Sequence, residues 1–324
     1  MGDLVVSLPA DEHPALLGRK RHWFITKGLG FLPEQALPKR SYTEFKRGFT
    51  PFRAWSMFRW FRQNSPEVAI FLHAPWWATM CAWLARVPIR MGRLSQWHSF
   101  LFLNHGVRQS RSVSDRHESD YNFDLIEHGF SKLGVKPTHD LNKVKRNYLK
   151  LAAPNPIGTV QSKGLRGRGY RVVHPGMGGS AMNWPSEYFV ELIQKLAQEM
   201  EVVVTGTKAD AKFLAPIRQN VTHPRVRWMV DELSARELLD ILSQAHSVVA
   251  PSTGVLHLAA SLGTPVLGIY SPRQVEHPKR WGPKGPRTHF VVPSIDGKSE
   301  VNPEVMKSIS PRLVMQDLHQ LEAQ

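Results

Sequence analysis

The stretch His246–Pro272 has the pattern of a strand, a helix and a second strand joined by short loops. Val248–Val249 begins a short buried strand, Ser252 or Thr253 occupies a helix N-cap position, and Val266–Tyr270 forms the second apolar run. A helix that opens just beyond a strand's carboxyl end presents unpaired N–H groups and the positive end of its dipole. We therefore expect an anion such as a phosphate to bind there.

A strand–turn–helix unit by itself is equally compatible with a structural scaffold, because every α/β protein contains several. His257 favours a site. It lies one helical turn after Thr253 and is expected to point back toward the same opening.

The second half of the chain alternates strands with helices. Strands are predicted at 170–174, 201–205, 226–230, 248–249, 266–270 and, at an edge, 290–292; helices are predicted at 187–199, from Asp210, at 234–245 and from Ser310–Pro311. This alternation predicts an α/β fold with a parallel sheet covered on both faces.

The first half is less regular, with strands predicted at 22–26, 67–72 and 89–94 and helices at 76–85 and 120–133. The opening Met-Gly-Asp leads directly into a helix-like segment, so the chain starts where the first strand of a doubly wound domain would have ended. Turn residues between 153 and 169 predict two domains, 1–155 and 165–324, with a last helix able to return to the first domain.

The segment Pro51–Asn64 interleaves five aromatic residues with three arginines. It could rest on an anionic membrane surface, with rings at headgroup depth and arginines on phosphates. Its aromatics form no single stripe at helical spacing, so a partly buried packing helix is an equal alternative.

The positive charge of the chain is concentrated in its first half. Residues 1–150 hold 23 Lys and Arg against 12 Asp and Glu, an excess of 11, whereas the remainder holds 19 against 15, an excess of 4. We expect the first half to face an acidic partner such as a phosphorylated lipid surface or an anionic glycan, the alternative being simple solubilisation.

The chain contains one cysteine, Cys81, so no intramolecular disulfide can form and a reducing compartment is expected. Cys81 lies in an apolar run where a core thiol is the default. The run 68–85 contains His73 and Pro75 and is predicted to break into a strand and a helix rather than to span a membrane.

Two loops of the second half are predicted to meet at one edge of the sheet. The first contributes Gly176, Gly178, Gly179 and Ser180, and the second contributes Ser252, Thr253 and Gly254. Because ligands of open α/β sheets bind outside the carboxyl ends of the strands, these loops together predict a nucleotide-diphosphate cradle. The glycine loop lacks the lysine of a Walker motif.

Three segments resemble glycosyltransferase family 9, the ADP-heptose:lipopolysaccharide heptosyltransferases. They are His174-Pro-Gly-Met-Gly-Gly-Ser-Ala-Met-Asn-Trp-Pro, Pro251-Ser-Thr-Gly-Val-Leu-His-Leu-Ala-Ala-Ser-Leu-Gly-Thr-Pro and Trp281-Gly-Pro. The first ten residues also match the family's opening motif. The resemblance covers the C-terminal half, whereas the middle of the N-terminal half matches only in organisation.

The resemblance implies a GT-B fold, in which two doubly wound domains face each other across a cleft. It implies that Asp3 is the catalytic base that takes the acceptor's proton during an inverting transfer. On the donor side it implies diphosphate and sugar contacts from Ser252, Thr253, Gly254 and His257, with Asp210 and Leu233 near the adenosine and Gly178, Gly179 and Ser180 completing the cradle. No Asp-x-Asp pair occurs in the chain, so neither a metal nor a cofactor is expected.

Three positions depart from the family pattern. The family's first strand is absent ahead of Met1, Met182 stands where a basic residue usually flanks the leaving group, and Ser252 stands where several heptosyltransferases have Asp. The last difference leaves the identity of the sugar open.

The leading hypothesis is a cytoplasmic, metal-independent inverting glycosyltransferase. It would move a heptose or a related sugar from an ADP-sugar to the anionic lipopolysaccharide core, with peripheral contact with the inner membrane. The alternatives are a nucleotide-sugar-binding protein or degenerate transferase without turnover, and a nucleotide-sugar epimerase. Nucleic-acid binding is least favoured, since no recognised motif accompanies the charge.

Overall fold

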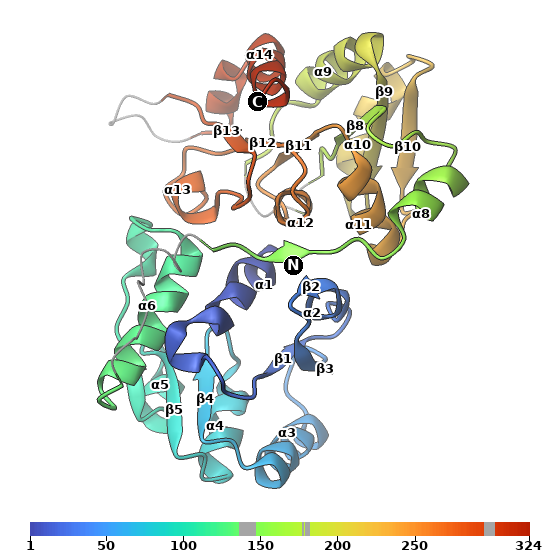
Figure 1. The fold of residues 1–324 in the computed structure, drawn as a ribbon. Coiled ribbons are helices and arrows are strands. Elements are labelled where there is room, and N and C mark those ends of the chain that lie inside the picture. The colour runs from blue at the N-terminus through green and yellow to red at the C-terminus, as the bar shows by residue number, and fades with distance from the viewer. Residues whose placement is uncertain (136–146, 177, 179–181, 295–301) are drawn as a thin grey trace. The chain divides into compact units, whose positions relative to one another are not determined.

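The structure is a computed structural model that describes residues 1–135, 147–176, 178, 182–294 and 302–324 (Figure 1). The chain forms two compact units. Unit 1 comprises Met1–Val5, Gln35–Lys39 and Tyr148–Gln324, and unit 2 comprises Val6–Glu34 and Arg40–Asn147. Helix α1 (Gly2–Ser7) begins in unit 1 and ends in unit 2. The units therefore divide near residue 148 rather than across 155–165, and two short N-terminal segments group with the C-terminal part.

Unit 1 is built on a six-stranded sheet in the order β10-β9-β8-β11-β12-β13, with every pairing parallel. Its strands are β8 (Tyr170–Val173), β9 (Glu201–Gly206), β10 (Val226–Val230), β11 (Val248–Pro251), β12 (Val266–Ile269) and β13 (Thr288–Val291). All residues of β8, β11 and β12 are buried, as expected of central strands that are covered on both faces. The predicted parallel sheet is confirmed.

The helices of unit 1 match the predicted alternation and add shorter elements. They are α8 (Pro156–Ser162), α9 (Ser186–Glu199), η4 (Lys208–Asp210), α10 (Ala211–Asn220), α11 (Ala235–Gln244), α12 (Gly254–Ser261), α13 (Pro278–Trp281), η5 (Pro303–Ser308) and α14 (Pro311–Glu322). The short strand β2 (Ala36–Leu37) pairs antiparallel with β7 (Lys150–Leu151) in the same unit.

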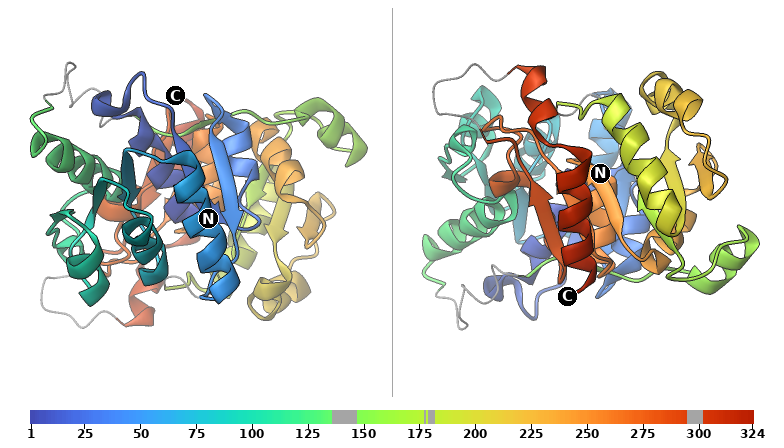
Figure 2. Two further views of the ribbon diagram at one scale, coloured as in Figure 1. Left: turned by 90° about the horizontal axis from the view of Figure 1, so that it is seen from below. Right: turned by 90° about the horizontal axis from the view of Figure 1, so that it is seen from above.

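Helix α14 packs beside α9 and against β12 and β13, all within unit 1, and Figure 2 shows the red α14 next to the yellow-green α9. Val314, Leu318 and Leu321 join the core formed with α9. The helix that was expected to be able to return to the first domain thus has its apolar face buried in unit 1.

Unit 2 contains two separate parallel sheets. Strands β4 (Val68–Phe71), β5 (Ile89–Arg93) and β6 (His105–Val107) form one, and β1 (His22–Thr26) pairs with β3 (Ser41–Phe45) in the other. A doubly wound sheet has the strand order 3-2-1-4-5-6. In that order β3 and β1 would take positions 3 and 2, and β4, β5 and β6 would take positions 4, 5 and 6. No strand precedes α1 among the described residues, and the sheet is divided at the place that a first strand takes in that order.

The helices of unit 2 surround these sheets. They are η1 (Leu8–Glu12), η2 (Pro14–Leu16), α2 (Phe31–Gln35), α3 (Pro51–Asn64), α4 (Trp76–Leu84), α5 (Trp97–Phe102), η3 (Arg111–Val113) and α6 (Glu118–Ser131). The run 68–85 divides into β4 and α4, as predicted. None of the described helices combines the length and the apolar character needed to cross a bilayer.

Cys81 is a buried core thiol, as predicted. Burial raises its pKa to about 11, so the thiol stays protonated at neutral pH, and its Sγ lies 3.3 Å from the Ala54 carbonyl of α3. Helix α3 also packs Met57 and Phe61 into this core while Phe52 and Trp55 stay 78% and 58% exposed. One face of α3 therefore fits the packing interpretation, and its exposed aromatics leave the surface interpretation open.

A buried arginine on β8 forms an ion pair with a glutamate on α14 in unit 1. The Arg171 guanidinium, on β8, donates to Glu322 at 2.8 and 2.7 Å and to Glu199 at 2.6 Å. The side chains of Arg171 and Glu322 are 4% and 8% exposed. Burial acts to raise the pKa of Glu322, but hydrogen bonds from Arg171 and Ser247 outweigh it and lower that pKa.

Replacing Arg171 with Leu is expected to reduce the free energy of unfolding at pH 7 by about 3 kcal/mol, because it leaves a buried carboxylate unpaired. Since the pKa of Glu322 is lowered by folding, the stabilisation from this pair is present above the carboxyl's unfolded pKa and is lost as the pH falls through its folded pKa. Urea unfolding at pH 7 and at acidic pH measures both effects. The exposed Lys195–Glu191 pair on α9 is the control, and Lys195→Gln should cost under about 1 kcal/mol. Equal losses for the two variants would refute this account.

Candidate functional site

The two predicted loops leave the sheet of unit 1 at the same edge. Strands β8 and β11 are parallel neighbours, with Val172 beside Val248 and Val173 beside Val249. The chain leaves β8 at His174 and leaves β11 through Ser252 and Thr253 into α12. Because the strands run in the same direction, both loops follow carboxyl ends, where α/β proteins bind ligands.

Thr253 is the N-cap residue of α12, but its side chain caps no backbone N–H. Its Oγ1 is buried and has no hydrogen-bond partner among the described residues. A threonine at this position usually accepts a hydrogen bond from the first turn, and a buried hydroxyl without a partner costs about 1–3 kcal/mol. The opening of α12 therefore carries a polar group that a ligand could satisfy.

Ser252 is linked to the Trp281-Gly-Pro motif through Tyr270. Tyr270 is fully buried and donates its phenolic hydrogen bond to the Trp281 carbonyl at 2.7 Å. Burial raises the pKa of Tyr270, and a hydrogen bond with the Ser252 hydroxyl opposes this effect. A Cβ at Gly268 would lie 2.5 Å from the Tyr270 ring, so this tight packing requires glycine.

His257 is 5% exposed and lies against the N-terminal segment of the chain. A Cβ at Gly2 would be 3.3 Å from Cδ2 of His257, and one at Gly254 would be 2.7 Å from Cε of Met1. Asp3, the predicted base, follows Gly2 in the first turn of α1 and is exposed. The structure therefore groups the Asp3 segment with α12 in unit 1, whereas the sequence assigned it to the first domain.

Asp210 lies against the glycine loop. A Cβ at Gly176 would be 2.4–2.8 Å from the three atoms of the Asp210 carboxyl group. Oδ2 of that carboxylate accepts hydrogen bonds from the Thr207 amide at 2.9 Å and from the Thr207 hydroxyl at 2.7 Å. Asp210 thus stabilises the turn after β9 and packs against the glycine loop at Gly176.

The remaining predicted donor residues are less constrained. Gly178 is exposed with φ +55°, a conformation that favours glycine, whereas Gly179 and Ser180 lie outside the described residues. Leu233 is half-buried in the loop between β10 and α11, two strands from β8. Neighbouring strands are about 4.8 Å apart, and β10 is three strands from β11, so Leu233 lies roughly 14 Å along the sheet edge from the opening of α12.

Sequence reasoning missed three residues around this edge. Tyr270 was read only as part of a strand, and Glu276 accepts a hydrogen bond from the Met182 amide at 3.2 Å. His174 bonds the Thr205 hydroxyl through Nδ1 at 2.9 Å, and burial lowers its pKa to about 4, although Asp210 opposes the shift. No local pattern marks these residues, because each acts through a partner distant in sequence. The side chain of Met182, at the family's usual basic position, is buried in the core of unit 1.

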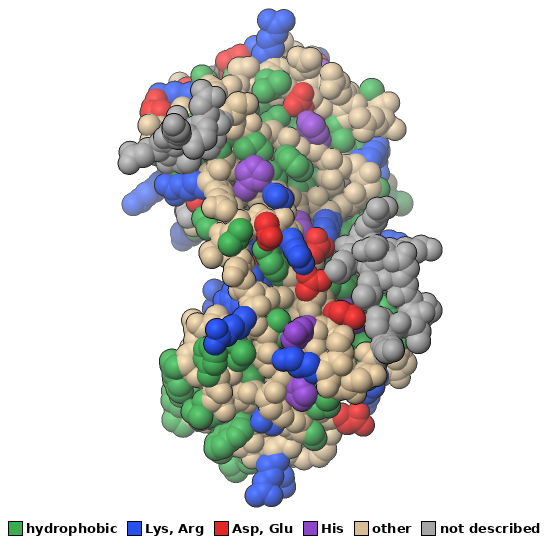
Figure 3. Space-filling model, turned by 90° about the vertical axis from the view of Figure 1, so that its left-hand side faces the viewer, with side chains coloured by type: hydrophobic (Ala, Val, Ile, Leu, Met, Phe, Trp, Pro, Cys, Tyr) green, Lys and Arg blue, Asp and Glu red, His purple; other side chains and the backbone are tan. Residues whose placement is uncertain are grey.

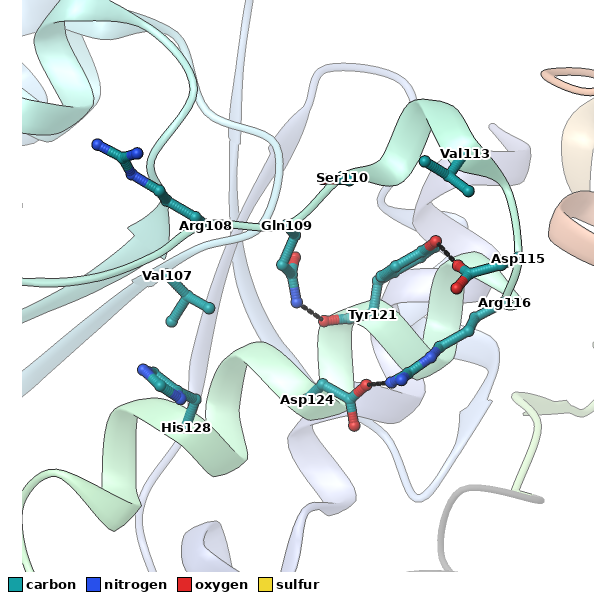
Figure 4. A pocket seen from close by; sticks show the side chains of 10 residues that line it. All are labelled: Val107, Arg108, Gln109, Ser110, Val113, Asp115, Arg116, Tyr121, Asp124 and His128. Carbon is teal, nitrogen blue, oxygen red and sulfur yellow. Dashed lines mark hydrogen bonds and ion pairs between the residues drawn. The ribbon is translucent and has the colours of Figure 1, made fainter.

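Unit 2 has a cavity of about 310 Å³ between the segment after β6 and α6 (Figure 4). Its walls include Arg108, Arg116, Tyr121, Asp124 and His128. Arg116 is paired with Asp124 at 2.5 Å, and the Tyr121 hydroxyl bonds Asp115, as Figure 4 shows. None of the sequence-predicted site residues lines this cavity.

Parallel α/β architecture with loops at the carboxyl edge of its sheet defines the class of open α/β-sheet proteins, which bind ligands at that edge. A family model described as glycosyltransferase family 9 (heptosyltransferase) matches residues 54–307. The chain therefore belongs to glycosyltransferase family 9. No group of three or more His, Cys, Asp or Glu side chains suited to a metal ion occurs in the described part of the chain.

Individual relatives agree with this assignment. The chain is 28% identical over 211 residues to a Haemophilus influenzae protein named only as a glycosyltransferase, covering 62% of this chain and 59% of the relative. It is 23% identical over 155 residues to lipopolysaccharide heptosyltransferase 2 of Salmonella typhimurium, covering 44% and 43% respectively. The chain thus spans about half the length of the curated relatives it matches.

Solved structures match nearly the whole chain. A family 9 glycosyl transferase from Veillonella parvula has a TM-score of 0.78 at 18% identity, covering 99% of this chain and 94% of its own. The ADP-heptose lipopolysaccharide heptosyltransferase II of Escherichia coli also has a TM-score of 0.78, at 16% identity, covering 99% and 96%. These likenesses confirm the fold class, an α/β fold with a central parallel sheet that matches GT-B heptosyltransferases.

Replacing Gly176 with Ala is expected to lower the melting temperature, because the new methyl would overlap the Asp210 carboxylate, at a cost of about 1–3 kcal/mol. Gly178→Ala is the control in the same loop, since nothing lies within 4 Å and only about 1 kcal/mol of backbone strain is expected. In an Asp210→Ala background Gly176→Ala should become nearly neutral. Additive losses in this double-mutant cycle would contradict the predicted contact.

Proposed function

We propose that this chain is an inverting, metal-independent glycosyltransferase that moves a heptose from ADP-heptose to the inner core of lipopolysaccharide. Family membership supports glycosyl transfer. One solved neighbour is an Escherichia coli heptosyltransferase with ADP-2-deoxy-2-fluoro heptose, and one relative is named a lipopolysaccharide heptosyltransferase. Both support this donor and this class of acceptor.

The observation that carries the proposal is the opening of α12, where the buried Thr253 hydroxyl has no partner among the described residues. The donor's diphosphate binds here, with Ser252, Thr253 and Gly254 at the helix N-terminus and His257 one turn later. Gly178, Gly179 and Ser180, which follow β8 in the sequence, contribute backbone N–H groups to the same donor site in this proposal. The adenosine extends toward Asp210 and Leu233 along the same edge. Backbone N–H groups and the helix dipole stabilise the charge that develops on the leaving diphosphate.

Asp3 acts as the base. Its carboxylate takes the proton from the acceptor hydroxyl as that oxygen attacks the anomeric carbon on the face opposite the diphosphate. A new glycosidic C–O bond forms, the bond between the anomeric carbon and the diphosphate oxygen breaks, and ADP leaves. The packing of Gly2 on His257 supports this role, because it brings the adjacent Asp3 to the donor end of α12.

The acceptor binds through unit 2, whose residues carry most of the chain's excess positive charge. The polar cavity of about 310 Å³ in this unit, lined by basic and acidic side chains, offers hydrogen-bonding groups for a sugar. The single buried thiol Cys81 fits a reducing compartment, so the reaction takes place in the cytoplasm.

Replacing Asp3 with Asn should lower kcat by about 10²–10⁴-fold, because the amide cannot accept the proton. The Kd for ADP, measured by calorimetry, should change less than about twofold, because Asp3 does not hold the diphosphate. Glu304→Gln is the control, an exposed acid on η5 of unit 1 that should leave kcat unchanged. Full activity of Asp3→Asn would remove Asp3 as the base. A wild-type chain that binds ADP-sugar without turnover with any acceptor would instead identify a binding protein.

Replacing Thr253 with Val should weaken ADP binding by about 10- to 150-fold, the equivalent of one hydrogen bond to a charged group. The unliganded protein should keep or slightly raise its melting temperature, because the hydroxyl has no partner there among the described residues. Ser261→Ala is a matched control: its buried Oγ also lacks such a partner, but it lies at the opposite end of α12. Equal ADP affinity in wild type and Thr253→Val, or in wild type and His257→Gln, would show that the diphosphate binds elsewhere.

A further inference from the structure

Exposed aromatic side chains are concentrated in one part of unit 2. The four exposed tryptophans of the described chain all lie between residues 55 and 97, at Trp55, Trp76, Trp83 and Trp97. In Figure 3, whose lower part draws unit 2, hydrophobic side chains gather along the left margin. Exposed large apolar side chains in unit 1 are scattered, as is normal for soluble surfaces.

Ring contacts join several of these side chains into a continuous surface. The ring centroids of Phe49 and Trp76 are 5.2 Å apart, and those of Trp76 and Trp97 are 6.3 Å apart. Trp97 continues along the outer face of α5 to Phe100 and Leu101, at helical spacings of three and four residues. These five residues, here called the aromatic patch, are between 37% and 65% exposed.

The elements that carry the aromatic patch are themselves fixed by packing and hydrogen bonds. The inner face of α5 is packed, with His98, Ser99 and Phe102 buried. The turn that carries Phe49 is fixed by Arg53, whose Nη1 donates to the carbonyls of Arg47 and Gly48 at 2.8 and 3.1 Å. Because these elements are anchored from within, the aromatic patch is a preformed surface.

The part of the chain that carries the aromatic patch is strongly basic. Residues 45–108 contain nine Lys and Arg and one acid, Glu67, a net charge of 9 − 1 = +8. Glu67 is paired with Arg19 at 3.2 Å. Lys46 and Arg47 are exposed beside Phe49, and the Arg108 guanidinium lies 5.7 Å from the centre of the Phe100 ring. Such a surface repels a second copy of itself and attracts an anionic one.

We propose that the aromatic patch docks unit 2 onto an anionic phospholipid bilayer. Tryptophan and phenylalanine rings prefer the headgroup region, and each arginine or lysine near an anionic surface adds favourable electrostatic energy. A protein with rings at that depth and cations around them binds the interface without spanning it. The sequence predicted an acidic partner for the whole first half and offered Pro51–Asn64 as one candidate surface, whereas the aromatic patch lies on other residues of that half. The proposal does not depend on which sugar is transferred.

Vesicle co-sedimentation of the full chain tests this directly. Vesicles of phosphatidylcholine with about one-third phosphatidylglycerol should bind it, and pure phosphatidylcholine vesicles should bind it at least about tenfold more weakly. A Trp97→Ala/Phe100→Ala/Leu101→Ala variant should lose at least about tenfold in binding to the anionic vesicles. Neutralising Lys46, Arg47 and Arg108 with Gln should also weaken binding, and raising the salt to 0.5 M should reproduce that loss in the wild type.

The control variant Ile157→Ala/Phe290→Ala removes two exposed apolar side chains from unit 1 and should bind anionic vesicles like the wild type. Circular dichroism and melting temperature establish that each variant is folded. Equal vesicle binding by the α5 variant and the wild type would overturn the proposal. So would an absence of vesicle binding together with a dimer, seen by analytical ultracentrifugation, that the α5 variant abolishes, since the occupant would then be a second copy.

Discussion

The parallel pairing of β8 with β11 is the constraint on which the candidate site depends. Val172 and Val173 lie beside Val248 and Val249, and two loops far apart in sequence consequently leave the sheet side by side. The strands are buried on both faces, so a slip in their register would disrupt the close packing of the core on either side. Around this pair the remaining contacts are local: Tyr270 joins Ser252 to Trp281, and Asp210 supports Gly176. The order of the strands in the sheet therefore brings the two loops of the candidate site together. Each loop is supported by side chains that pack against it.

Much of unit 1 could be predicted from the sequence, because its strands are short apolar runs and its helices carry N-cap signals such as Ser234 and Ser310. The same alternation predicts the position of the candidate site, which stays a prediction. Unit 2 was harder. Strands β3 and β6 are only partly buried and lack a clear apolar pattern, so neither was predicted. Tyr270, Glu276 and His174 were missed as site residues because their partners are set by tertiary packing. The grouping of Met1–Val5 with α12 could not be predicted either. It depends on the close approach of Gly2 to His257 and of Gly254 to Met1, which no local sequence pattern indicates.

The two units differ in their charge and in the groups that they expose. Unit 1 presents helix-terminal and glycine backbone groups, which suit a diphosphate, and a buried ion-pair network around Arg171 that holds its last helix. Unit 2 carries the excess of basic residues, a polar cavity and the exposed aromatic patch. Under the proposed function, this separation lets one unit recognise a soluble nucleotide sugar while the other meets an acceptor embedded in a membrane. Under the proposed function, Met182 in place of the family's usual basic residue leaves more of the leaving-group stabilisation to backbone groups.

Hydrogen–deuterium exchange in the presence and absence of ADP tests the central claim most directly, because it locates the nucleotide without assuming which side chains bind it. The account predicts slower exchange in peptides that cover Pro251–Leu258 and the segment that begins at His174, with little change in peptides covering Arg108–His128 of unit 2. Protection by ADP confined to the cavity of unit 2, with none at the start of α12, would contradict it.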